Sequence, residues 1–262
     1  MEPLVTVGLP IYNAEAYLSE CIESIKAQTL KEFTVLAVLD CPTDRSAKIL
    51  RKHADSRFQI FENESNLGLT ATGNRMLALC QTDFLARMDH DDIMLPERLQ
   101  KQYDFLRLHP EIDVLGTYFD LIDKSGKVVA KPHKFGLTPE EIREEFRIYP
   151  ALHHPTVMYR VARLKEIGGY FSKYSEDSSL WLKGLVIGLK YANLSDCLLH
   201  YRVHSKQTLS TQREHWLAAL DEAYAEFGPQ IWGDRAPNFV SGATRMERMK
   251  RRIKRKLSSL FT

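Results

Sequence analysis

The first 120 residues alternate between short apolar runs and amphipathic segments, and this alternation limits the fold more than any other feature of the chain. Apolar runs of strand length occupy residues 5–11, 33–39, 58–61, 84–88 and 114–122. Helices are expected between them, at 13–25, 44–53, 70–79 and 96–108. Strands that alternate with helices of this length build β-α-β units with parallel strands. The chain is therefore predicted to be α/β, with a single Rossmann-like, mostly parallel sheet flanked by helices.

Local signals mark the ends of several helices. Asn13 and Asp44 are expected to start the first two helices, Asn13 as a side-chain cap. Pro96 suits the first turn of the fourth helix, and Asp92 is either the cap of that helix or a site residue. A last helix is expected from about residue 212 to 227, where Gly228-Pro229 would end it.

The 262 residues suit one large domain, which we divide into two halves and a tail. Residues 1–120 form the α/β half, 121–230 a less regular second half, and 231–262 a linker and a tail. The four cysteines include no C-x-x-C pair, which argues against a disulfide framework or a zinc site and suits a reducing cytoplasm. Neither a secretory signal nor a membrane-spanning segment is expected.

Polar or turn residues follow four of the predicted strands, at 10–13, 40–44, 66–68 and 89–92. In open α/β sheets, ligands bind beyond the carboxyl ends of the strands. The last of these segments holds three carboxylates within four residues, directly after an apolar run. Buried carboxylates are costly unless they are paired or bind a metal, and Mg²⁺ and Mn²⁺ prefer such oxygen ligands. No G-x-G-x-x-G and no G-x-x-x-x-G-K-[ST] occurs, which argues against a dinucleotide site or a P-loop.

Together these segments resemble the family 2 glycosyltransferases, inverting enzymes with the GT-A fold. The resemblance covers roughly residues 3–210. It rests on Val5–Asn13, Gln28-Thr29, Asp40–Asp44, Asn66–Gly68, Ala86–Ile93, Leu95–Leu99, His154–Met158, Gly168–Tyr170, Glu176-Asp177, Leu180-Trp181 and Tyr201–His204. It implies a metal-dependent transfer of sugar from a nucleoside diphosphate-sugar, expected to be a UDP-sugar, to a glycan or lipid-linked hydroxyl. Bacterial enzymes of polysaccharide or lipopolysaccharide synthesis are the expected relatives.

The resemblance also implies residue roles. Asp40 is expected to accept the imide N–H of uracil, and Tyr12 to line the base pocket. Asp91 is the expected ligand of Mn²⁺ or Mg²⁺, Asp89 a contact of the ribose or sugar and of the metal, and His204 a further metal or diphosphate contact. Other contacts with the nucleotide-sugar are expected from Pro10, Asn13, Asn66, Gly68 and His90.

The Glu176-Asp177 pair is expected to supply the catalytic base, with Asp177 favoured over Glu176. Inverting transfer needs one base to take the proton of the acceptor hydroxyl as its oxygen attacks the anomeric carbon. A divalent metal stabilises the leaving diphosphate, so no covalent nucleophile is needed. His154 and Trp181 are expected on the acceptor side, and for His154 a structural role is the alternative.

One segment departs from the family's pattern. The family often has Asp-Asp-Gly-Ser where this chain has Leu39-Asp40-Cys41-Pro42. The second acid is kept and the first is lost. Base binding is therefore expected to survive, without the contacts of the first acid.

The net charge of +2 conceals a strongly basic C-terminus. Residues 245–262 hold eight Lys or Arg and one Glu, and their apolar residues recur at helical spacing. Such basic amphipathic helices lie on anionic membranes, so the tail is expected to hold a cytoplasmic enzyme at the inner face of the cell membrane. A solvated extension is the alternative. Nucleic acid is not an expected partner, and the oligomeric state is open.

Two other functions stay open. A sugar nucleotidyltransferase would share the sheet, but it needs a glycine-rich first loop with Arg or Lys, which Pro10–Asn13 lacks. A catalytically silent, membrane-associated assembly partner is the second. The intact Asp89, Asp91 and Asp177 argue against it.

Overall fold

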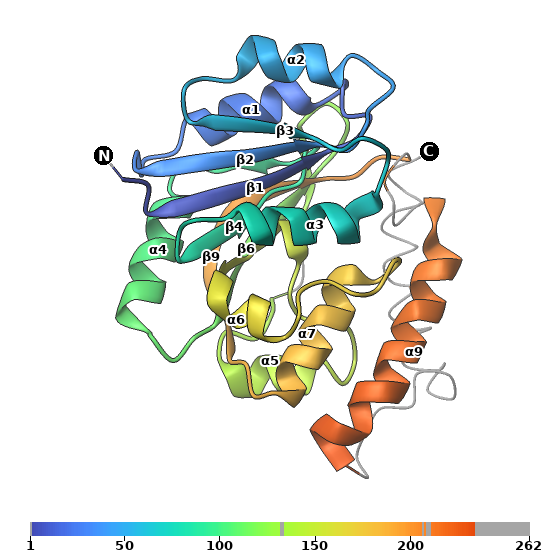
Figure 1. The fold of residues 1–262 in the computed structure, drawn as a ribbon. Coiled ribbons are helices and arrows are strands. Elements are labelled where there is room, and N and C mark those ends of the chain that lie inside the picture. The colour runs from blue at the N-terminus through green and yellow to red at the C-terminus, as the bar shows by residue number, and fades with distance from the viewer. Residues whose placement is uncertain (1, 132–133, 206, 208–210, 234–262) are drawn as a thin grey trace.

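The computed structural model describes residues 2–131, 134–205, 207 and 211–233. Within them a nine-stranded sheet has the order β3-β2-β1-β4-β8-β6-β9-β5, with β7 beside β6 (Figure 1). The elements are β1 Val5–Ile11, α1 Leu18–Lys26, β2 Phe33–Leu39, α2 Ser46–His53, β3 Phe58–Glu62, α3 Gly68–Leu79, β4 Phe84–Arg87, β5 Ile93–Met94, α4 Arg98–Leu108, β6 Val114–Ile122, β7 Val128–Ala130, α5 Pro139–Glu145, η1 His154–Thr156, β8 Met158–Arg160, α6 Val161–Glu166, α7 Glu176–Val186, β9 Tyr191–Arg202 and α9 Arg213–Trp232.

The two halves of the sheet differ in strand direction. Strands β3, β2, β1 and β4 are parallel, as predicted, and Val5 pairs with both Phe33 and Phe84. Beyond them β8 is antiparallel to β4 and to β6, while β9 is parallel to β6. The two-residue β5 pairs with the end of β9, so the segment between β4 and β5 lies beside Arg202. The α/β prediction is confirmed, with a mixed second half.

Both faces of the sheet are buried. Helices α1 and α2 cover one face, and α3, α6 and α7 lie on the other (Figure 1). In β1 the odd residues from Val5 to Ile11 pack into the core with α1. Met76 and Leu77 of α3 join Leu180 and Trp181 of α7 in the opposite core. No helix in the described ranges has both the length and the apolar character needed to cross a bilayer.

Two predicted helix caps are wrong. α1 begins only at Leu18, and Asn13 instead uses its Oδ1 to accept from the Thr43 N–H at 2.8 Å. Asn13 has φ 46°, a left-handed conformation that asparagine tolerates better than most residues. Asp92 does not cap α4 either, because α4 starts at Arg98 and the carboxylate of Asp92 is buried elsewhere. Each of these two side chains instead makes a hydrogen bond to a residue distant in the sequence, which a local pattern does not reveal.

The predicted end of the last helix is also wrong. α9 continues through Pro229 to Trp232. Proline removes one main-chain hydrogen bond within a helix. The final turn is held by packing, since the ring of Trp232 stacks on Tyr224 with centroids 6.3 Å apart. The predicted linker beyond Gly233 and the tail at 245–262 lie outside the described residues.

Candidate active site

The end of β2 presents a buried carboxylate, Asp40, that organises the loop before α3. One oxygen accepts from the side-chain amide of Asn63 at 2.6 Å and from the Leu67 N–H at 2.8 Å. The other accepts from the Gly68 N–H at 2.9 Å. A carboxylate has about four acceptor positions, so one stays available on the second oxygen. Asp40 thus fixes the 66–68 loop and can still take one more donor.

The end of β1 lies against this carboxylate. The Asp40 N–H donates to the carbonyl of Ile11, and the next residue, Tyr12, is 42% exposed. The buried Pro10 offers its carbonyl to the Nδ1 of His90, 3.3 Å away. Of the predicted donor contacts in this loop, Tyr12 is therefore the one whose side chain is free to meet a ligand, while Pro10 orients His90.

The three acids after β4 have three separate environments. Asp89 pairs with the buried Arg87, whose Nε and Nη2 donate to the same carboxylate oxygen at 3.0 and 2.8 Å. Asp91 meets His204, with Oδ2 and Nε2 3.0 Å apart. Asp92 accepts from the Arg202 N–H at 2.8 Å. The sequence analysis expected different roles for the three acids but did not identify these partners.

Asp91 and His204 form an arrangement that suits one edge of a metal site. Each side chain is 16% exposed, so both reach the surface. Neighbouring ligands of an octahedral ion with bonds of about 2.1 Å lie about 3.0 Å apart, which is the separation of these two atoms. Within the described residues no group of three His, Cys, Asp or Glu side chains could hold an ion by itself. A metal bound here would need oxygen ligands from a substrate or water.

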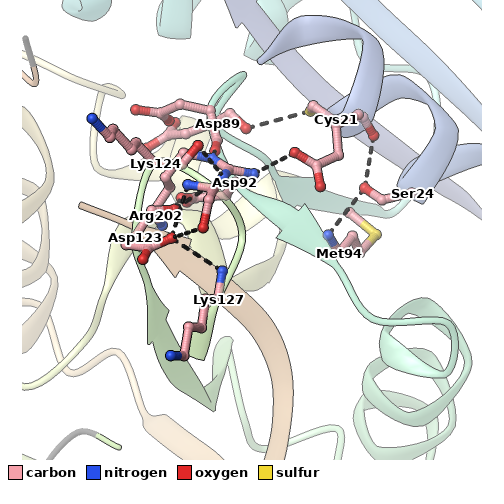
Figure 2. A network of polar contacts seen from close by, with 12 residues as sticks. Cys21, Ser24, Asp89, Asp92, Met94, Asp123, Lys124, Lys127 and Arg202 are labelled. Atoms are coloured by element: carbon pink, nitrogen blue, oxygen red, sulfur yellow. Dashed lines mark hydrogen bonds and ion pairs between the residues drawn. The ribbon is translucent and has the colours of Figure 1, made fainter. Parts of the chain in front are cut away.

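Arg202 braces the loop that carries the acids (Figure 2). The side chain is 1% exposed, and its Nε donates to the Asp91 carbonyl at 2.8 Å. Nη1 donates to the Asp123 carbonyl at 3.1 Å and Nη2 to the carboxylate of Glu20 at 2.5 Å. The second oxygen of Asp92 is buried and has no hydrogen-bond partner among the described residues. Burial and the charges of its acidic neighbours raise the pKa of Asp92 well above its usual range.

The Glu176-Asp177 pair opens α7 and lies close to the β4 acids in space. Asp177 accepts from the Ser178 N–H at 2.6 Å. Burial raises the pKa of Asp177, and the charge of Asp89 adds to the rise. Burial, then the charge of Asp177, raises the pKa of Glu176 to about 8. Near neutral pH Glu176 therefore keeps a proton beside Asp177, whose own pKa is also raised.

The predicted acceptor-side residues are core residues in this structure. The Nε2 of His154 lies 2.9 Å from the hydroxyl of Tyr170, and burial lowers the pKa of His154 to about 3. Trp181 is fully buried and stands edge-on to His154, with ring centroids 6.0 Å apart. Any effect of these two side chains on an acceptor would act through their neighbours, so their role stays a prediction.

Three buried arginines support the site, and the sequence analysis assigned none of them a partner. Arg98 donates to the carbonyls of Arg87 and Val157 at 2.8 and 3.2 Å and so holds the end of β4. Arg98 lies inside the Leu95–Leu99 segment that resembles the family. That resemblance is the sequence signal that could have identified it. Arg87 and Arg202 are the other two. Charged side chains are rarely buried unless paired, and pairing depends on tertiary contacts.

Comparison with known proteins identifies a family and several relatives. A family model described as Glycosyl transferase family 2 matches residues 6–168. An uncharacterized glycosyltransferase of Methanocaldococcus jannaschii is 33% identical, over 78% of this chain and 72% of that protein. The amylovoran biosynthesis glycosyltransferase AmsE of Erwinia amylovora is 32% identical, over 81% and 80%.

Solved structures share the fold. S. aureus TarS 1–349 in complex with UDP-GlcNAc superposes with a TM-score of 0.70 at 23% identity, over 86% of this chain and 66% of that one. The mannosyltransferase PcManGT from Pyrobaculum calidifontis, in complex with GDP-Man and Mn²⁺, gives 0.68 at 18% identity, over 94% and 70%. The predicted GT-A type of α/β fold is confirmed by these similarities. With the family match and the AmsE similarity, they lead to one conclusion: this chain belongs to glycosyl transferase family 2 and is a glycosyltransferase.

Proposed function

We propose that this chain is a metal-dependent inverting glycosyltransferase that takes a sugar from a nucleoside diphosphate-sugar. The observation that carries the proposal is the set of three features from distant parts of the chain: the Asp40 carboxylate, the Asp91–His204 pair and the Glu176-Asp177 pair with its raised pKa values. They match the three needs of the reaction, which are a donor anchor, charge compensation for the leaving diphosphate and a base.

The donor would lie across the ends of β1 and β2. The free acceptor position of Asp40 suits the imide N–H of uracil, and the exposed ring of Tyr12 suits one face of a base. Asn13, Asn66 and Gly68 would border this pocket through the loops they form. A UDP-sugar is the proposed donor, and the UDP-GlcNAc bound to TarS supports that class.

Asp91 and His204 would hold the metal, with Asp89 turned toward the sugar or ribose by Arg87. Carboxylate oxygen with imidazole suits Mn²⁺, and carboxylate with water suits Mg²⁺. Such an ion supplies compensation for the charge that develops on the leaving diphosphate. The Mn²⁺ in the PcManGT complex supports this choice.

Asp177 would take the proton of the acceptor hydroxyl. Its raised pKa would make it a stronger base than an ordinary aspartate, and Glu176 beside it keeps a proton near neutral pH. The neutral Glu176 limits the negative charge beside the incoming diphosphate. A hydroxyl of a glycan or a lipid-linked saccharide is the proposed acceptor, in bacterial polysaccharide or lipopolysaccharide synthesis. The name of AmsE supports this acceptor class.

The basic tail would bring the enzyme to the cytoplasmic face of the membrane, where a lipid-linked acceptor lies. Residues 245–262 supply the positive charge and the apolar repeat for such binding. Full-length protein should pellet with vesicles containing anionic lipid, and protein ending at residue 244 should not. Pelleting of the shortened protein would contradict membrane binding through the tail.

Calorimetry and donor hydrolysis test the proposal. Asp91→Ala should abolish Mn²⁺-dependent binding of UDP, while Asp177→Asn should keep binding and lose hydrolysis of the donor. Asp196→Ala, at a surface ion pair with Lys101, serves as the control and should change neither. Unchanged UDP binding by Asp91→Ala would refute the metal assignment. Retained turnover by Asp177→Asn would move the base to another residue.

A further inference from the structure

The loop that leads to the base, residues 169–175, is attached to α3, the helix that begins at the donor end of the site. Asn74 of α3 brackets the main chain of Tyr170. Its Oδ1 accepts from the Tyr170 N–H at 2.8 Å, and its Nδ2 donates to the Tyr170 carbonyl at 2.7 Å. One turn earlier, the hydroxyl of Thr70 donates to the Ser172 carbonyl at 2.5 Å. Three hydrogen bonds from one helix face thus hold this loop.

α3 and the loop lie so close together that two glycines at their contact have no room for a side chain. Gly169 has φ 71°, and an added Cβ would collide with the Oδ1 of Asn74. An added Cβ at Gly73 would lie 2.8 Å from the ring of Tyr170. The amide of Asn74 therefore fits against a backbone that only glycine can adopt at low cost.

The loop connects the fixed backbone of Tyr170 to the residues of the base. The Ser175 N–H donates to the Ser172 hydroxyl at 3.3 Å, and Ser175 is the residue before Glu176 and Asp177. Burial raises the pKa of Tyr170 to about 12, and the charges of Glu176 and Asp177 add to this rise. At its other end, α3 starts with Gly68, whose N–H binds Asp40. One helix therefore joins the donor anchor to the base.

We propose that Asn74 is a positioning residue for this reaction: its side-chain amide fixes the Tyr170 backbone and thereby sets where Glu176 and Asp177 stand relative to the donor. The inference rests on the proposed function, since it concerns the same base. Asn74 touches no substrate in this scheme. A misplacement of about 1 Å in a reacting group lowers turnover about a hundredfold, which is the size of effect we expect.

Two substitutions separate the two hydrogen bonds. Asn74→Leu removes both. Asn74→Asp keeps the acceptor and sets a carboxylate oxygen against the Tyr170 carbonyl, but protonation of the new carboxyl group restores the donor. Asn193→Asp is the matched control, because the Nδ2 of Asn193 also donates to a main-chain carbonyl, that of Gly136, at 2.8 Å.

The experiment measures UDP binding with Mn²⁺ and hydrolysis of whichever UDP- or GDP-sugar the wild type uses fastest. Asn74→Leu should bind UDP within about twofold of wild type and lose about a hundredfold in kcat. The activity of Asn74→Asp relative to wild type should rise on the order of tenfold from about pH 8 to about pH 6, as the protonated fraction of the introduced carboxyl group grows. Asn74→Leu and Asn193→Asp should show no such rise.

Each of these results would overturn the inference: wild-type kcat in Asn74→Leu, a pH-independent ratio for Asn74→Asp, or equal losses in Asn74→Asp and Asn193→Asp. A loss of UDP binding in proportion to the loss of turnover would also overturn it, because Asn74 would then serve the donor pocket. Wild-type protein that binds neither UDP nor GDP and hydrolyses no donor would instead refute the proposed function.

Discussion

Glu176→Gln should remove a specific pH dependence of stability. In the folded chain, burial and the charge of Asp177 raise the pKa of Glu176 from 4.5 to about 8. The folded state therefore keeps a proton that the unfolded state has already released. This proton stabilises the fold fully below about pH 4.5, and the contribution is lost as pH rises toward 8.

The magnitude follows from proton linkage. Across this window one bound proton changes the free energy of unfolding by about 1.4 kcal/mol per pH unit at most. Glu176 is only partly buried, and solvent relaxation keeps the measured slope below this limit. Relative to Glu176→Gln, wild type should therefore lose up to about 1.4 kcal/mol between pH 6 and pH 7, and the difference should level off above about pH 8.

Urea denaturation of both proteins at half-unit steps from about pH 5 to about pH 9 measures the difference. Asp177→Asn provides a second check, because removing the neighbouring charge should move the window to lower pH. Parallel stability curves for wild type and Glu176→Gln would refute the reasoning. They would mean that Glu176 ionises alike in the folded and unfolded states.

Two other substitutions test the supports of the site. Arg202→Met should lower the free energy of unfolding by roughly 3–5 kcal/mol in urea titrations, because it leaves the Asp91 and Asp123 carbonyls without their donor. A loss below about 1 kcal/mol would show that water replaces the guanidinium there. Cys41→Gly should raise the free energy of unfolding by about 0.5–1 kcal/mol. Cys41 is exposed and has φ 54°, a backbone conformation that glycine adopts without strain. A decrease would mean that the thiol has a stabilising contact.

The strand predictions that the structure confirms rest on the burial of continuous apolar runs. β1, β2 and β6 have the predicted bounds, since Val5–Ile11, Phe33–Leu39 and Val114–Ile122 are too apolar to lie outside a sheet. The predictions that failed rested on single polar residues or breakers. Local patterns predicted helix ends at Asn13, Asp92 and Pro229. In the structure the first two make hydrogen bonds to distant residues, and α9 continues through Pro229.

The sequence by itself determined the α/β sheet, the polar strand ends and the membership of the chain in its family. Only the tertiary structure decided which partner each acid has. Asp89 pairs with Arg87, Asp91 with His204 and Asp92 with Arg202. Burial, and then the charge of the neighbouring Asp177, keeps the proton on Glu176. The physical reason is that the burial of each acid is set by the whole fold, and that the partners of Asp91 and Asp92 lie more than a hundred residues away along the chain. Periodicity and spacing describe neighbours in sequence, whereas electrostatics and hydrogen bonding depend on neighbours in space.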